Sequence, residues 1–381
     1  MTGLELLLFS ILAILPSACA VLLVTPLVLR TALSQDLVDK PSERKVHQSQ
    51  TPMGGGVAIW IGIVSTFATA TIGLWVLQSY PDLAARALPT WAAPHVAGAW
   101  AQQGKLWGLL LAATLLMILG LVDDKRGLPW TWRLGLQFVI AGAMVTWQDW
   151  RLTAFIDWPP ITWGLSVLWI VALINAFNML DNMDGLSAGV AAIASCVLAA
   201  NMLLGHEPQT GQPQLFVAGL LLVLAGALLG FLWHNRPPAK IFMGDAGSYL
   251  IGFTVAVGTM LATYTGYEAG RPHAILAPVC VLAVPFFDMV TVIWIRIKQG
   301  RSPFHADKNH LSHRLVVLGF TKGQAVAVIY LLTLTTGLAA LLLPRLDLVG
   351  AFITFCLVVS VMVLIGLLES TGRRPKNDES P

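Results

Sequence analysis

The sequence predicts an all-α protein that crosses a membrane about eleven times. Of its 381 residues, 56% are hydrophobic and only 11% are charged, whereas soluble domains carry about 25% charged residues. Apolar stretches close to the ~20 residues that a membrane-spanning helix needs recur along the whole chain. We therefore predict one integral-membrane domain over residues 1–370, followed by a polar tail at 371–381.

The expected helices follow one another with short polar connections. They cover residues 5–29, 54–78, 106–122, 129–148, 160–177, 185–204, 214–233, 246–263, 274–295, 323–343 and 347–368. Glu5, and the absence of basic residues before the first stretch, favour a retained first helix over a cleaved signal peptide.

The lysines and arginines predict the orientation of the chain. Eighteen of the 23 fall on one side of the expected topology and five on the other. Loops rich in these cations stay in the cytoplasm. Because an odd number of spans puts the termini on opposite sides, we predict an N-terminus outside and a C-terminus inside.

Composition also excludes several kinds of site. The cysteines at 19, 196, 280 and 356 all lie in apolar runs without CxxC spacing, which argues against disulfides and thiolate metal sites. The net charge of +3 is small and its cations are spread over loops, so we expect no nucleic-acid partner.

Two adjacent carboxylates, Asp123 and Asp124, end the third expected helix and are followed by Lys125 and Arg126. Each carboxylate raises the pKa of the other unless a cation lies nearby. A divalent metal or a cationic partner would relieve this repulsion. The alternative is a solvated helix end that the two following cations neutralise.

A second polar group, Asn178, Asp181 and Asp184, lies at the expected cytoplasmic end of another helix. If the segment is helical, spacings of three residues put all three side chains on roughly one face. That arrangement suits a metal or a cationic group. The alternative is a loop in which Asp184 caps the helix that starts near Leu186.

Two further stretches fit phosphate binding. Gly244 and Gly247 flank Asp245, so main-chain amides at a helix start could approach a phosphate or metal, and Phe242 could stack on a base. An ordinary turn with a good N-cap explains this stretch equally well. His310, His313 and Arg314 are donors for phosphate oxygens, although a solvated loop has similar composition.

Two polar features remain. The segment from Asp39 to His47, followed by glycines 54–56, could bind phosphate or lipid head groups, or be a plain cytoplasmic loop. Asp288 lies within an apolar run, where a carboxylate is costly and is usually functional or paired. Arg296, two turns later, is its expected partner.

Taken together, these stretches resemble the polyprenyl-phosphate N-acetylhexosamine-1-phosphate transferases, the MraY/WecA-like membrane enzymes. The matching text is DxPxxRKxH and PxGG at 39–55, DDK at 123–125, NxxDxxDG at 178–185, NxxPAKIFMGDxGS at 235–248 and SPFxxDxxHLxHR at 302–314. Each motif alone is weak, but five in one order cover nearly the whole chain.

This resemblance implies that a sugar-1-phosphate passes from a UDP-sugar to undecaprenyl or another polyprenyl phosphate, with release of UMP. It also implies Mg²⁺, with Mn²⁺ as a substitute, an eleven-helix fold and a bacterial inner-membrane location with a cytoplasmic active site. A homodimer is a further expectation from the resemblance.

The resemblance also assigns roles to the motif residues. Asp245 matches the metal-ligating aspartate, with Asp181 as a second expected ligand. The expected catalytic residues are Asp123, Asp124, Asp181 and Asp184. The expected substrate-binding residues are Asn178, Asn235, Lys240, Phe242, His310, His313, Arg314, Lys45 and His47.

One position departs from the pattern. WecA-like members usually carry a further histidine where this chain has Ser312. The histidine loop is nevertheless shorter than in MraY, which favours a UDP-N-acetylglucosamine donor over the peptide-bearing muramyl donor. Other classes fit less well: an intramembrane prenyltransferase needs longer aspartate runs, and a transporter does not explain carboxylates collected on one face.

Overall fold

The computed structural model confirms an all-α polytopic protein and describes residues 1–39, 51–152, 156, 158–205, 212–268, 272–304 and 307–371. Its long helices are α1 (Gly3–Ser34), α2 (Gly55–Ser79), α5 (Gln103–Arg126), α6 (Trp130–Gln148), α7 (Pro159–Leu180), α8 (Leu186–Leu204), α9 (Leu215–Asn235), α10 (Gly244–Glu268), α12 (Ala283–Lys298), α14 (Lys322–Leu342) and α15 (Leu348–Thr371). The short elements are α3 (Pro81–Ala87), α4 (Val96–Ala101), α11 (Leu276–Val281), α13 (Leu311–Val317), η1 (Ala93–His95), η2 (Pro272–Ile275), η3 (Leu343–Arg345) and the strands β1 (Val38–Asp39) and β2 (Thr51–Pro52).

Helices occupy all eleven predicted positions, but two differ from a simple span. Among the described residues, nine helices are long and apolar enough to cross a membrane. The other two positions are α6, which is more polar, and the stretch 274–295. That stretch is split at Leu282 into α11 and α12. Pro285 in the first turn of α12 explains the break, because proline lacks the N–H that would continue the preceding helix.

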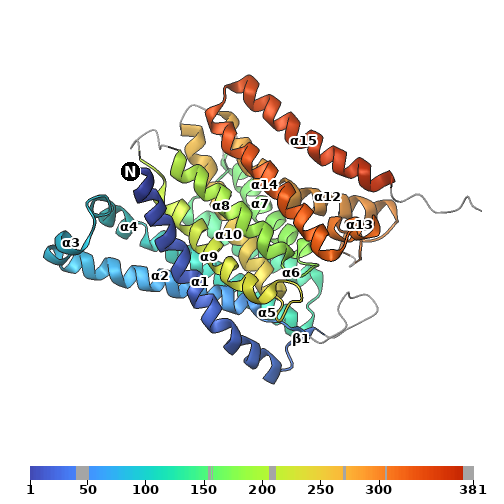
Figure 1. Ribbon diagram of the computed structural model, residues 1–381, viewed down its shortest axis with the longest axis horizontal. Helices are drawn as coiled ribbons and strands as arrows, with labels where there is room; N and C mark the ends of the chain where they lie inside the picture. The colour runs from blue at the N-terminus through green and yellow to red at the C-terminus, as the bar shows by residue number, and fades with distance from the viewer. Residues whose placement is uncertain are drawn as a thin grey trace, which may run out of the picture.

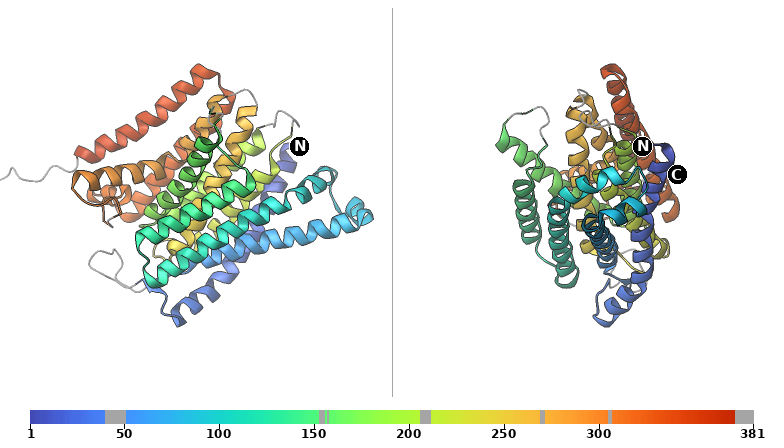
Figure 2. Two further views of the ribbon diagram at one scale, coloured as in Figure 1. Left: turned by 180° about the vertical axis from the view of Figure 1, so that it is seen from behind. Right: turned by 90° about the vertical axis from the view of Figure 1, so that its left-hand side faces the viewer.

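Helix α10 forms the centre of the bundle. In its membrane-spanning part 89% of the residues are buried, compared with 11% in α1 and 22% in α15. It packs against α2, α5, α7, α8 and α9, and buries Tyr249 and Phe253 almost completely. Figure 1 shows α15 and α1 on opposite outer sides of this core. Figure 2 shows α2 and the short helices after it extending away from the bundle.

Helix direction brings the polar motifs together at one end of the bundle. The C-terminal ends of α5, α7 and α9 lie there beside the N-terminal end of α10, at the lower right in Figure 1. The strands β1 and β2 pair antiparallel at the same end and continue into the entry of α2. The predicted ligands Lys45 and His47 lie outside the described residues.

Candidate active site

The carboxylate of Asp123 is buried among donors in the last turn of α5. Its Oδ2 accepts hydrogen bonds from Arg133 Nη1 at 2.9 Å and from the Tyr249 hydroxyl at 3.1 Å. Its Oδ1 accepts the main-chain N–H of Leu128 at 2.7 Å. Gly127 makes this turn possible, because its φ of 64° ends α5 in the left-handed region. The cation beside Asp123 is therefore Arg133, from α6, and not one of the two that follow it in sequence.

Asp124 has a different environment although it is the next residue. Its two oxygens accept the main-chain N–H groups of Asp245 and Ala246, at 2.8 and 3.2 Å. These amides belong to the first turn of α10, where N–H groups have no partner within the helix. Asp124 thus caps α10 from a neighbouring helix and holds the main chain of Asp245 in place.

Glycines allow this close approach. A Cβ on Gly120 would lie 2.4 Å from main-chain atoms of Asp245 and Ala246. A Cβ on Gly244, whose φ is +69°, would lie 2.4 Å from Oδ2 of Asp124. Only glycine fits at both positions, which accounts for the glycine immediately before Asp245.

Asp245 joins residues of four helices. Its Oδ1 accepts Asn178 Nδ2 at 2.6 Å, and the same amide donates to the Ser248 hydroxyl at 3.0 Å. Its Oδ2 lies 3.6 Å from Nη1 of Arg133. The structure therefore brings together four residues predicted from three separate motifs, Asp123, Asp124, Asn178 and Asp245.

The second pair of carboxylates lies in a loop and not on a helix face as the spacing predicted. Helix α7 ends at Leu180, and Asp181 and Asp184 follow it. Burial raises the pKa of Asp181 to about 8, and the charges of Asp124 and Asp184 add to the effect. Asp184 is also not the N-cap of α8, since Gly185 holds that position. Its Oδ2 accepts the N–H of Ala239 at 2.9 Å instead.

These oxygens suit a hard divalent cation. Within the described parts of the chain, no three histidine, cysteine, aspartate or glutamate side chains form a complete ligand set. Mg²⁺ does not require one, because it is usually bound by one or two carboxylates together with substrate phosphates and water. Burial, together with the nearby charges of Asp124 and Asp184, raises the pKa of Asp181 by disfavouring its charged form, which a cation would favour again.

The predicted nucleoside residues have distinct environments. Asn235 is buried, and its amide links two loops: Oδ1 accepts the N–H of Gly185 at 3.0 Å, and Nδ2 donates to the Ile241 carbonyl at 2.8 Å. Phe242 is half-buried, with its main chain paired to Pro52 and Gly55. The Lys240 side chain is exposed at the same end.

The histidine segment forms the short helix α13 beside α12. His310 Nδ1 lies 2.8 Å from Oδ2 of Asp288, so the prediction that Asp288 pairs with Arg296 is wrong. The guanidinium of Arg296 instead contacts Asp307 at 2.9 Å. Burial lowers the pKa of His313 to about 4, so its ring is neutral near pH 7.

Comparison with known proteins agrees with the motifs. The model of glycosyl transferase family 4 matches residues 106–263. A probable undecaprenyl-phosphate N-acetylglucosaminyl 1-phosphate transferase of Bacillus subtilis (strain 168) is 29% identical over 93% of this chain and 90% of its own length. The decaprenyl-phosphate N-acetylglucosaminephosphotransferase of Mycolicibacterium smegmatis is 35% identical over 76% of this chain and 71% of its own. The undecaprenyl-phosphate alpha-N-acetylglucosaminyl 1-phosphate transferase of Escherichia coli K12 is 31% identical over 79% and 75%.

The chain belongs to this family. The resemblance inferred from five short motifs is thus confirmed. The described motif residues lie at one end of the bundle, and the Arg314 side chain among them is buried. Its guanidinium donates to the Asn309 carbonyl and the Thr291 hydroxyl, both at 2.9 Å, and lies 2.8 Å from Glu369. A direct role of Arg314 in substrate binding stays a prediction.

Sequence reasoning missed two residues of this site, both of which contact Asp123. Arg133 is a lone cation in the first turn of a largely apolar stretch, and Tyr249 lies one helical turn after Asp245. These two positions in the sequence could have identified both residues. The spacing of four residues from Asp245 to Tyr249 puts the two side chains on one face of α10.

Proposed function

We propose that this chain transfers N-acetylglucosamine-1-phosphate from UDP-N-acetylglucosamine to a polyprenyl phosphate and releases UMP. The observation that carries the proposal is the convergence of Asp123, Asp124, Asn178 and Asp245 beside Arg133, in a chain of this family. The names of the similar proteins favour the N-acetylglucosamine donor over the muramyl-pentapeptide donor.

The reaction balances without a covalent enzyme intermediate. An oxygen of the lipid phosphate attacks the phosphorus that carries the sugar, and the bond from this phosphorus to the oxygen of UMP breaks. UMP leaves with the electron pair, and the sugar keeps its phosphate on the lipid. A lipid phosphate is already anionic near neutral pH, so the attack needs no strong base. Positioning and charge neutralisation then supply most of the catalysis.

The contacts of the paired carboxylates favour this direct attack over an aspartyl-phosphate. Asp123 accepts three hydrogen bonds, and both oxygens of Asp124 accept main-chain N–H groups. A carboxylate engaged in this way is a poor nucleophile, because its lone pairs are already shared with donors. We assign Asp124 to holding the first turn of α10, and Asp123 to fixing Arg133 and Tyr249.

Asp245 and Asp181 would hold the Mg²⁺ ion of the proposed reaction. The ion would neutralise the diphosphate of the donor. Asn178 orients the carboxylate of Asp245 through the 2.6 Å hydrogen bond to its Oδ1. Arg133 adds a fixed positive charge 3.6 Å from the other oxygen of Asp245.

We infer further that the protein lies in the plasma membrane of a bacterium and that this end of the bundle faces the cytoplasm. The inference rests on the distribution of lysine and arginine, which favours this end over the other. UDP-sugars are made in the cytoplasm, so the donor would reach the carboxylates from that side.

The test is incubation of purified protein with polyprenyl phosphate, Mg²⁺ and a panel of radiolabelled UDP-sugars. We expect lipid-linked N-acetylglucosamine and UMP in equal amounts. Release of UDP in place of UMP would indicate transfer of the sugar alone and contradict the proposal. Absence of a lipid product with every donor would argue for another class of protein.

A further inference from the structure

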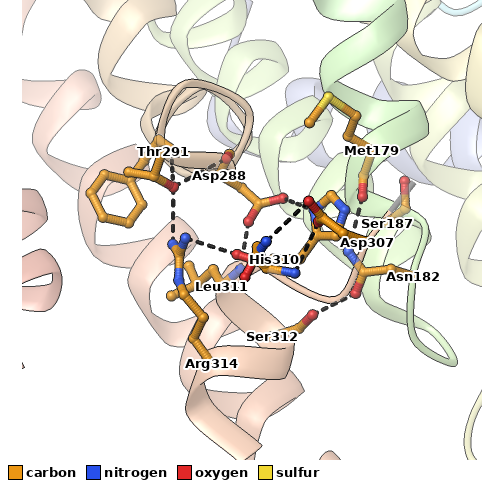
Figure 3. A network of polar contacts seen from close by, with 12 residues as sticks. Met179, Asn182, Ser187, Asp288, Thr291, Asp307, His310, Leu311, Ser312 and Arg314 are labelled. Atoms are coloured by element: carbon orange, nitrogen blue, oxygen red, sulfur yellow. Dashed lines mark hydrogen bonds and ion pairs between the residues drawn. The ribbon is translucent and has the colours of Figure 1, made fainter. Parts of the chain in front are cut away.

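Helix α12 carries a carboxylate that the proposed reaction does not use. Asp288 has 0% of its surface exposed. Its Oδ2 lies 2.8 Å from His310 Nδ1, and its Oδ1 accepts the main-chain N–H of Leu311 at 2.6 Å. Figure 3 shows both contacts reaching from α12 to the start of α13. One carboxylate thus binds two consecutive residues of the histidine segment, one by its ring and one by its main chain.

This geometry fixes the tautomer of a neutral His310 ring. A carboxylate only accepts hydrogen bonds, so a neutral imidazole beside it carries its proton on Nδ1. Nε2 is then the nitrogen with the lone pair. A carboxylate behind a histidine commonly sets its tautomer and ring orientation in this way. The contact to Leu311 holds the main chain from which the ring projects.

Other contacts fix α13 relative to the carboxylate-bearing loop. The Ser312 hydroxyl donates to Oδ1 of Asn182, whose Nδ2 donates to the Met179 carbonyl at 2.9 Å. Asn182 lies directly after Asp181, so α13 is held between α12 and this loop (Figure 3). Where the family pattern has a histidine, Ser312 supplies this link.

The rival reading of Asp288 as a counter-ion for Arg296 does not fit. Arg296 donates to both oxygens of Asp307, at 2.9 and 3.3 Å, and to the Pro303 carbonyl at 2.6 Å. Asp307 in turn accepts the N–H and the side-chain amide of Asn309. This second network braces the loop before α13 and leaves Asp288 to His310 and Leu311.

We propose that Asp288 is a positioning residue that orients His310, in the Nδ1–H tautomer, toward the substrate of this site. The substrate in this proposal rests on the proposed function. The tautomer of His310 rests only on the contacts of Asp288 with His310 and Leu311. Asp288 acts through His310 and does not itself contact the substrate.

The variant Asp288→Asn separates orientation from packing. Its amide oxygen still accepts the Leu311 N–H, while its NH₂ group faces Nδ1 of His310. The ring must then accept at Nδ1 and carry its proton on Nε2. We expect a fall in kcat of about 10–100-fold, the usual cost of losing such a supporting contact. The KM for UDP-N-acetylglucosamine and the thermal midpoint should change little.

A double-mutant cycle tests whether Asp288 acts through the ring. In a His310→Ala background, Asp288→Asn should cause no further loss of kcat, since coupled residues are not additive. Equal losses in both backgrounds would overturn the proposal, as would a loss confined to the thermal midpoint. Asp149→Asn is the matched control, because this carboxylate is exposed and forms a local ion pair with Arg151 at 2.8 Å.

A direct measurement on the wild-type chain needs neither a variant nor activity. Nitrogen-15 NMR of labelled histidines, recorded at a pH where the spectrum shows a neutral His310 ring, should assign its single proton to Nδ1. A proton on Nε2 would overturn the proposal even if the enzyme is active. If the chain makes no lipid-linked product, the proposed function fails, while the NMR result still decides the tautomer.

Discussion

The contact between α5 and α10 makes a quantitative prediction at Gly120. An alanine there would put its Cβ 2.4 Å from the Asp245 carbonyl and the Ala246 nitrogen, where ordinary contacts begin near 3.4 Å. Both obstacles are main chain and cannot rotate away. The two helices must therefore separate by about 1 Å, and the cap that Asp124 places on α10 must lengthen with them.

The expected loss follows from that displacement. Moving a metal-binding or substrate-binding group by about 1 Å costs on the order of 100-fold in rate. Overpacking a close helix contact costs about 1–3 kcal/mol of stability, which leaves a folded chain. We therefore expect Gly120→Ala to lose about 100-fold in UMP release while it keeps a cooperative thermal transition in detergent.

Gly135→Ala is the matched control. This glycine lies in α6 near the same end of the bundle, but apart from its chain neighbours and its own helix backbone no atom lies within 4 Å of the position where its Cβ would be. Alanine there should keep full activity and slightly stabilise the helix. The reasoning is refuted if Gly120→Ala retains activity within about threefold of wild type, or if both variants lose activity equally.

Three further predictions concern single side chains. Asp245→Asn should abolish Mg²⁺-dependent UMP release without unfolding the protein; full activity, measured with radiolabelled donor, would contradict the metal assignment. Asn235→Ala should lower the thermal midpoint, because it leaves the Gly185 N–H and the Ile241 carbonyl without partners, at about 1–3 kcal/mol for each buried group. Hydrogen bonds from Arg296 and Asn309 outweigh the effect of burial and lower the pKa of Asp307 from 3.8 to about 2. The stability gained is present above pH ~4 and is lost as the pH falls toward 2, so the difference in thermal midpoint between wild type and Asp307→Asn should shrink over that window.

Helix direction explains why so much of the site could be predicted. Because successive spans run in opposite directions, every second connection returns to the same side of the membrane. Motifs in those connections therefore share one end of the bundle. Asp124 and Asp245, 121 residues apart, lie at the same end for this reason, and the packing of α5 against α10 then brings them within hydrogen-bonding range. Apolar length and composition supplied the spans themselves. Neither signal contains the rotation of each helix about its axis, which decides the partner of each side chain.

The pairing predicted for Asp288 failed for a related reason. Arg296 lies eight residues later on the same helix, and a rise of 1.5 Å per residue separates them by about 12 Å along the axis. Its true partners, His310 and Leu311, come from a chain segment that returns after a loop. A sequence pattern within one helix cannot reveal a contact made between two elements.

Helix rotation also explains why adjacent carboxylates do different things. Successive residues of an α-helix point about 100° apart, since 3.6 residues complete one turn. Asp123 therefore meets Arg133 and Tyr249, and Asp124 meets the free N–H groups at the start of α10. Separate donors thus stabilise the two carboxylates, a guanidinium and a main-chain N–H for Asp123 and two main-chain N–H groups for Asp124. Asp245 and Asp181 remain the proposed metal ligands, and Asp124 holds the main chain of Asp245 through its hydrogen bonds to the first turn of α10.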